Sequence, residues 1–161
     1  MKPLRVLFLS TGNAARSLLA EALLNAKGSD RFTARSAGFK PLPEIQPETL
    51  ALLKAHGITT NGLHTKGWNE FLLAASFLPT DVIVTLSEEA RINCPVWPNN
   101  PVKVHWAVDD PLGAERLDVR EWKFRKCFST LDTRITTLVR SRLPATPSAL
   151  FMQLKDIGMV V

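Results

Sequence analysis

The chain of 161 residues has few cysteines, no tyrosine and no long apolar run. Its two cysteines, Cys94 and Cys127, are too few for the disulfide framework of a secreted domain. No apolar stretch approaches the roughly 18 residues that a membrane span needs. The apolar run at residues 6–9, after a basic start, is too short for a signal peptide. We therefore expect a cytoplasmic protein with no membrane partner.

The sequence also has no spacing of histidines and cysteines that is typical of a zinc site, and no patch of interleaved aromatic and basic residues. Its net charge of +5 at pH 7 makes nucleic acid one candidate partner, because basic surfaces attract phosphates. Without a supporting motif, we attribute the charge to solvated helix faces and to a positive field around an anion pocket. We expect no nucleic acid partner, no metal and no bound cofactor.

Strand-like and helix-like patterns alternate along the chain. Strands are expected at residues 5–9, 32–36, 81–86 and 102–106, and helices at residues 17–26, 47–55, 68–75 and about 115–142. The alternation predicts an α/β fold, a single three-layer domain whose four-stranded parallel sheet has helices on both faces. We expect this domain at residues 1–142 and a C-terminal extension at residues 143–161. Within the extension, residues 149–157 form either a small docked helix or a partly mobile tether.

The most informative segment is Ser-Thr-Gly-Asn-Ala-Ala-Arg-Ser, which runs from Ser10 to Ser17 between the first expected strand and a helical pattern. A loop in this place directs several backbone N–H groups at one point, and the helix dipole adds positive potential. Arg16 can complete the cradle with a bidentate pair of hydrogen bonds. The segment therefore predicts a site for a dianionic tetrahedral oxyanion. The residues expected to line it are Thr11, Gly12, Asn13, Ala14, Ala15, Arg16 and Ser17.

The pattern Cys-x5-Arg-Ser after a first strand marks the low-molecular-weight tyrosine phosphatase family, which includes the thiol-dependent arsenate reductases. The chain resembles this family throughout the loop, and Ala20-Glu21-Ala22 is typical of the reductase branch. It departs at Ser10, which stands where the family has its nucleophilic cysteine. A cysteine beside an arginine at a helix N-terminus is a thiolate near neutral pH. A serine without a neighbouring base stays protonated and attacks poorly.

A second segment follows the fourth expected strand and ends in Asp109-Asp110-Pro111. The proline restrains the preceding carboxylate, and a carboxylic acid near the cradle can protonate a departing oxygen. In the resembling family the aspartate immediately before the proline has this role, which selects Asp110. Taken alone, Asp-Asp-Pro is more often a turn or a helix cap, but its place after this strand, together with the Ser10 to Ser17 loop, favours the proton donor.

A third segment carries Ser87, after the third expected strand, and Cys94, which precedes a proline. The resemblance places a second redox cysteine at position 87 and a third at position 94. In the family's scheme the nucleophile forms an arsenate adduct, the second thiol attacks the first sulfur and releases arsenite, and the third moves the disulfide outward. Each exchange needs a sulfur, so Ser87 interrupts the relay and only Cys94 remains.

Sulfur is thus replaced by oxygen at two roles of one reaction. A deliberately inactivated variant, which we favour, would carry both changes, and so would a natural lineage that abandoned redox chemistry. Serine codons at both positions in the genome would exclude the first account. The resemblance also implies that Asn13, Glu21 and Ser36 brace the loop by hydrogen bonds, although Glu21 fits a solvated helix face as well. Cys127 is expected to be a buried structural thiol.

The leading hypothesis is an arsenate reductase that binds arsenate, phosphate or sulfate and uses an external thiol reductant (thioredoxin, glutaredoxin or a small thiol). In it the catalytic residues are Ser10, Arg16, Ser87, Cys94 and Asp110. One alternative is a tyrosine phosphatase, but Leu112-Gly113 follows the Asp-Pro where such phosphatases have aromatic residues. The other is an oxyanion-binding protein without catalysis.

Overall fold

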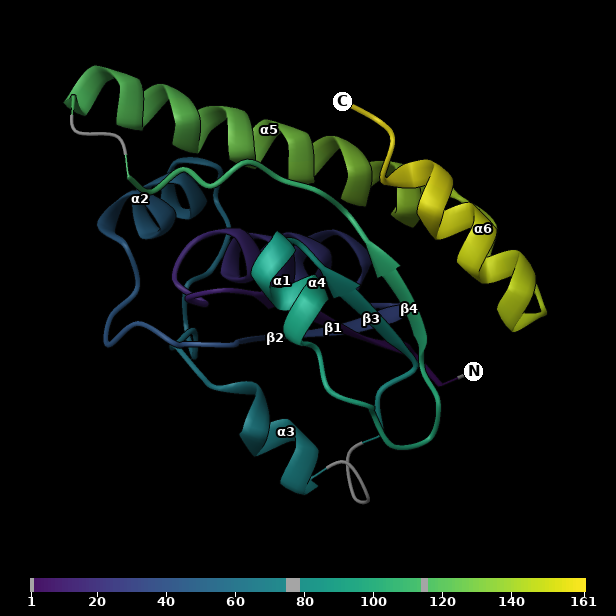
Figure 1. The fold of residues 1–161 in the computed structure, drawn as a ribbon. Helices are drawn as coiled ribbons and strands as arrows, with labels where there is room; N and C mark the ends of the chain where they lie inside the picture. Colours follow the sequence, from purple (N-terminus) through teal and green to yellow (C-terminus); the bar gives the residue numbers. More distant parts are fainter. Residues whose placement is uncertain (1, 75–78, 114–115) are drawn as a thin grey trace.

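The computed structural model describes residues 2–74, 79–113 and 116–161, in which a parallel sheet lies between two layers of helices (Figure 1). The strands are β1 (Leu4–Ser10), β2 (Phe32–Gly38), β3 (Val82–Thr85) and β4 (Val102–His105). They pair in the order β2-β1-β3-β4, and every pairing is parallel. The predicted α/β fold with a four-stranded parallel sheet is confirmed.

The helices differ from the prediction mainly by one addition. They are α1 (Arg16–Gly28), α2 (Pro47–Ala55), α3 (Trp68–Ala74), α4 (Glu88–Asn93), α5 (Leu117–Arg140) and α6 (Pro147–Ile157). Helix α2 has the predicted bounds, with proline in its first turn. Helix α4 was missed because its six residues carry too little periodicity; Ser87 followed by two glutamates was the available signal. The expected helix ends at residues 75 and 115 lie outside the described residues.

Alternation along β1 divides the apolar core between the two faces of the sheet. Val6 and Phe8 belong to the larger cluster, which includes buried residues of α1, α5 and α6. Leu7 and Leu9 belong to the smaller cluster, together with Trp68 of α3 and Ala90 of α4. Because β1 is buried from both faces, the end of this strand is a rigid support for the loop that follows it.

The strand order also places the candidate site. The chain passes from β1 to β2 on one side and then returns to β3 on the other side of β1. In open α/β sheets, ligands bind beyond the carboxyl ends of the strands where such a reversal occurs. The end of β1, which is Ser10, therefore meets the loops after β3 and β4, which carry Ser87 and Asp110, at this edge.

The C-terminal extension contains a docked helix. Leu150, Leu154 and Ile157 of α6 are buried in the larger core cluster. A boundary at residue 142 stays a prediction, since α6 shares its core with the sheet. Within the described ranges, each helix is too short or too polar to cross a bilayer.

Candidate active site

The loop between β1 and α1 has its carbonyl groups turned outward. Four of them accept backbone hydrogen bonds of 2.8–3.1 Å from the segment between β2 and α2: Ser10 from Phe39, Thr11 from Lys40, Gly12 from Leu42 and Ala14 from Gln46. In a planar trans peptide, the C=O and the following N–H point in opposite directions. The next N–H groups along the chain are therefore directed into the loop. The hydrogen bond from the N–H of Asn13 to Ser10 Oγ, at 3.2 Å, is consistent with this direction.

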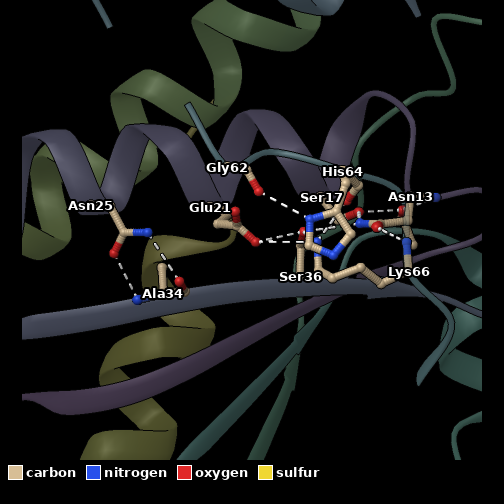
Figure 2. Close-up of polar contacts among 10 residues, drawn as sticks. Asn13, Ser17, Glu21, Asn25, Ala34, Ser36, Gly62, His64 and Lys66 are labelled. Carbon is tan, nitrogen blue, oxygen red and sulfur yellow. Dashed lines mark hydrogen bonds and ion pairs between the residues drawn. The ribbon is translucent and has the colours of Figure 1, made fainter. Parts of the chain in front are cut away.

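Asn13 holds the loop in its shape from within (Figure 2). Its φ of +50° is left-handed, a conformation that asparagine tolerates better than most residues. Its side chain is fully buried and donates from Nδ2 to Ser17 Oγ (2.7 Å) and Ser36 Oγ (2.9 Å). Its Oδ1 accepts the backbone N–H of Lys66 at 2.8 Å. Gly38 permits this approach, since a Cβ there would lie 3.0 Å from the Asn13 backbone nitrogen.

Behind Asn13, a buried lysine completes the network (Figure 2). Ser36 Oγ donates to Glu21 Oε1 at 2.8 Å and accepts from Lys66 Nζ at 3.3 Å. The Lys66 ammonium lies 3.6 Å from Glu21 Oε1 and also donates to the carbonyl of His64 at 2.8 Å. Burial lowers the pKa of Lys66, and the nearby Glu21 carboxylate opposes this shift. The structure thus brings Glu21, Ser36 and Asn13 together and adds Lys66, for which the sequence shows no motif.

Arg16 links the loop to the aspartate segment. It is the first residue of α1 and is only 9% exposed. Its Nη1 donates to the carbonyl of Val108 at 3.0 Å, and its Nη2 lies 3.7 Å from Asp110 Oδ2. The Asp110 side chain is 53% exposed, and its Oδ1 accepts the N–H of Leu112 at 3.0 Å. Asp110 is therefore part of a turn and also a neighbour of the Arg16 guanidinium.

The two serines have different surroundings. Ser10 Oγ lies 2.6 Å from Ser17 Oγ, inside the loop. Ser87 Oγ accepts from Thr11 Oγ1 at 2.9 Å and from the N–H of Ala90 at 3.1 Å. Ser87 is therefore the N-cap of α4 and touches the residue that follows Ser10.

Neither cysteine is held as a thiolate. Cys94 is half-buried at the C-cap of α4, where burial raises the pKa of its thiol while the ammonium of Lys103 opposes the rise. Cys127 of α5 is buried, and burial raises its pKa to about 12, consistent with a structural thiol. Among residues 2–74, 79–113 and 116–161, no cluster of histidine, cysteine and acidic side chains could hold a metal ion.

Comparison with known proteins identifies the family. The model of the low molecular weight phosphotyrosine protein phosphatase family matches residues 5–147. The chain belongs to this family. The family resemblance that the loop from Ser10 to Ser17 carries is thereby confirmed. The match ends at the first residue of α6, so this helix lies almost entirely beyond the part that the family model describes.

Several relatives within the low molecular weight phosphotyrosine protein phosphatase family are named arsenate reductases. One from Halalkalibacterium halodurans is 31% identical over 137 residues, which are 84% of this chain and 95% of the relative. The crystal structure of arsenate reductase from Archaeoglobus fulgidus superposes with a TM-score of 0.66 at 27% identity, covering 84% of this chain and 99% of that one. A thioredoxin-dependent arsenate reductase of Corynebacterium glutamicum has a TM-score of 0.65 at 26% identity, covering 85% of this chain and 61% of that one.

Proposed function

We propose that this chain is an arsenate reductase scaffold that binds arsenate, phosphate or sulfate in the loop from Ser10 to Ser17. The observation that carries the proposal is the direction of the loop N–H groups, which converge around Ser10 because the loop carbonyls are bonded outward. The guanidinium of Arg16 adds a formal positive charge beside them. Such an arrangement binds a tetrahedral dianion without reorganising, since the donors are already in place.

Each residue of the site has a distinct role in this proposal. Arg16 clamps equatorial oxygens of the anion, and Asp110 protonates the oxygen that leaves the central atom. The nucleophile belongs at position 10, where the partners of the Ser10 oxygen, within the part of the chain that the structure describes, are another serine hydroxyl and a backbone N–H. With no base to take its proton, the Ser10 hydroxyl is a poor nucleophile. The chain as it stands therefore binds the oxyanion and does not reduce it.

The contact between Thr11 and Ser87 supports position 87 as the second relay position, because a sulfur there would lie against the nucleophile loop. Passing the disulfide on to Cys94 needs a change of structure. The six residues of α4 separate positions 87 and 94, and a helix of this length rises about 9 Å. A disulfide requires Cα atoms within about 7 Å. Helix α4 must therefore unwind when Cys94 takes over the disulfide.

The external reductant is a thiol, and thioredoxin, glutaredoxin and a small thiol are its candidates. The thioredoxin dependence named for the Corynebacterium glutamicum relative favours the first. The phosphatase alternative needs only a cysteine at position 10 with Arg16 and Asp110. It is disfavoured by Leu112-Gly113, which offers no aromatic wall for a phenyl ester.

The test is to install cysteine at both positions. The Ser10→Cys/Ser87→Cys variant should release arsenite from arsenate when thioredoxin, glutaredoxin or a small thiol is supplied, whereas the unaltered chain should only bind arsenate. Adding Cys94→Ser to this variant should stop multiple turnover. If the double variant binds arsenate but releases no arsenite with any of these reductants, the proposal is wrong. Strong aryl-phosphate turnover by Ser10→Cys alone would favour the phosphatase instead.

A further inference from the structure

Two consecutive carbonyls of the segment after β4 are held by two different arginines. Arg16 Nη1 donates to the carbonyl of Val108 at 3.0 Å, and Arg134 Nη1 donates to the carbonyl of Ala107 at 3.0 Å. Adjacent carbonyls in an extended segment point in opposite directions, so these bonds reach the segment from two sides. We call residues 106–110 the acid loop, since they lead from β4 to Asp110. The acid loop is therefore fixed between α1 and α5 just before the carboxylate.

Arg134 is an unusual residue to find in this place. It lies on α5, is only 6% exposed, and burial lowers the pKa of its guanidinium. Among the described residues it has no carboxylate within ion-pair distance, although a buried charge without a partner is costly. Backbone carbonyls compensate instead: its Nε donates to Val160 at 2.9 Å, in addition to the bond to Ala107. One side chain thus joins the C-terminal residues to the acid loop.

Helix α6 contacts the beginning of the same loop independently. Trp106 is fully buried, and its Nε1 donates to the carbonyl of Leu154 at 2.8 Å. Gly158, directly after α6, packs so closely that a Cβ would lie 2.5 Å from Cδ1 of Trp106. The C-terminal extension therefore touches the acid loop both through Trp106 and through Arg134.

We propose that α6 and the residues after it position the acid loop for proton transfer, with Arg134 as the positioning residue that connects them to Asp110. This rests on the proposed role of Asp110 as proton donor and extends it to a part of the chain that the family model does not describe. Asp110 is half-exposed, so the orientation of its carboxyl group depends on the backbone to which it is attached. The extension holds this backbone from one side and Arg16 from the other.

The first test measures the loop directly by hydrogen–deuterium exchange in the unaltered chain and in Arg134→Ala. The N–H groups of Trp106 and Val108 donate to Thr85 and Leu86, and their exchange reports the anchoring of the loop. The matched control is Arg31→Ala, since Arg31 also donates to two backbone carbonyls, those of Val139 and Ser141, away from the acid loop. We expect about tenfold faster exchange in Arg134→Ala only. Equal exchange in both variants would overturn the proposal.

The second test asks whether anchoring of the acid loop affects proton transfer from Asp110 to the leaving group. In a Ser10→Cys background, phenol departs from phenyl phosphate only with a proton on its oxygen, whereas 2,4-dinitrophenolate departs without one. Arg134→Ala should lower kcat/KM for phenyl phosphate about tenfold, because small misplacement of a catalytic group is costly. It should leave kcat/KM for the dinitrophenyl ester, which reports the same phosphoryl transfer without the proton, unchanged. Arg134→Lys should restore part of the loss, and deletion of residues 158–161 should act in the same direction.

Asp110→Asn in the same background separates the proposed role of Asp110 as proton donor from the proposed positioning role of Arg134. If Asp110→Asn does not discriminate between the two esters, the assignment of Asp110 fails, and the exchange experiment alone decides whether the extension anchors the loop. The exchange experiment also decides alone if the background hydrolyses neither ester. If Asp110→Asn discriminates but Arg134→Ala slows both esters equally, Arg134 has only a structural role and the positioning proposal is wrong.

Discussion

Ser10 ends β1 and Ser87 lies just after the neighbouring strand β3, and the hydroxyl groups of the two serines make different contacts. Ser10 Oγ lies inside a loop whose shape is set by other residues, above all by Asn13 and by the outward hydrogen bonds of the carbonyls. Ser87 Oγ itself holds structure together, since it caps α4 and accepts from Thr11. A change at position 10 should therefore affect chemistry more than stability, and a change at position 87 should affect stability as well.

The largest effect is expected on the affinity of the Ser10 loop for anions when the positive charge of Arg16 is removed. Arg16→Ala should weaken phosphate or arsenate binding by about 100-fold, because hydrogen bonds to charged groups are each worth roughly 1.5–3 kcal/mol. Titration calorimetry of the unaltered chain and the variant measures this. Arg91→Ala is the control, as Arg91 is an exposed arginine that pairs with Glu88. Retained affinity in Arg16→Ala would show that the backbone N–H groups suffice.

Asn13 tests whether the loop is held by its surroundings. Asn13→Ala should lower the free energy of unfolding by about 2 kcal/mol, because it leaves buried partners unpaired and puts alanine at a left-handed φ. Asn13→Gly loses the same hydrogen bonds but tolerates that φ. The glycine variant should therefore be more stable than the alanine variant by about 1 kcal/mol in urea unfolding. Equal stability of the two would mean that backbone strain at position 13 is negligible.

The serines themselves can be compared directly. Ser87→Ala should cost about 1 kcal/mol, the usual effect of removing an N-cap. Ser10→Ala removes the acceptor of the Asn13 N–H but no cap, and Ser17 Oγ keeps its bond from Asn13, so we expect a smaller loss of about 0.5 kcal/mol. Thermal and urea unfolding of the two variants decides the order. A larger loss from Ser10→Ala would reverse the distinction between the two positions.

The smallest effect concerns the segment that holds the loop carbonyls. Arg120 donates to the side chains of Glu48 and Gln46. The backbone N–H of Gln46 in turn donates to the carbonyl of Ala14 in the loop. The hydrogen bond from Arg120 lowers the pKa of Glu48 below its ordinary value of 4.5. Because this pKa is lower in the folded chain than in the unfolded chain, the stabilisation is present above pH 4.5 and is lost as the pH falls through the folded value.

Glu48→Gln should therefore cost about 0.5 kcal/mol at pH 7, a typical value for a partly exposed ion pair. The difference from the unaltered chain should shrink toward zero in acid. Urea unfolding at several pH values measures it. A difference that stays constant with pH would mean that the charge of Glu48 is unimportant.

The local features of this protein could be predicted from its sequence. The type of each longer element follows from apolar periodicity, and the proposal of an anion site at residues 10–17 rests on a strand, a glycine turn and Arg16 before a helix. The pair Asp110-Pro111 likewise carries its signal within two residues. The short helix α4 was not predicted, because the sequence signals it only by its N-terminal cap.

Tertiary structure decided everything that depends on distant partners. The ammonium of Lys66 reaches Ser36 from 30 positions away, and Arg134 reaches Ala107 from 27 positions away. Neither residue lies in a pattern, because a buried cation that bonds backbone carbonyls needs no particular neighbours in sequence. The same holds for α6: the sequence left it open as a docked helix or a partly mobile tether, and only the packing on Trp106 decided between them. Sequence determines local conformation and the chemistry available, while long-range contacts decide which groups meet and how firmly they are held.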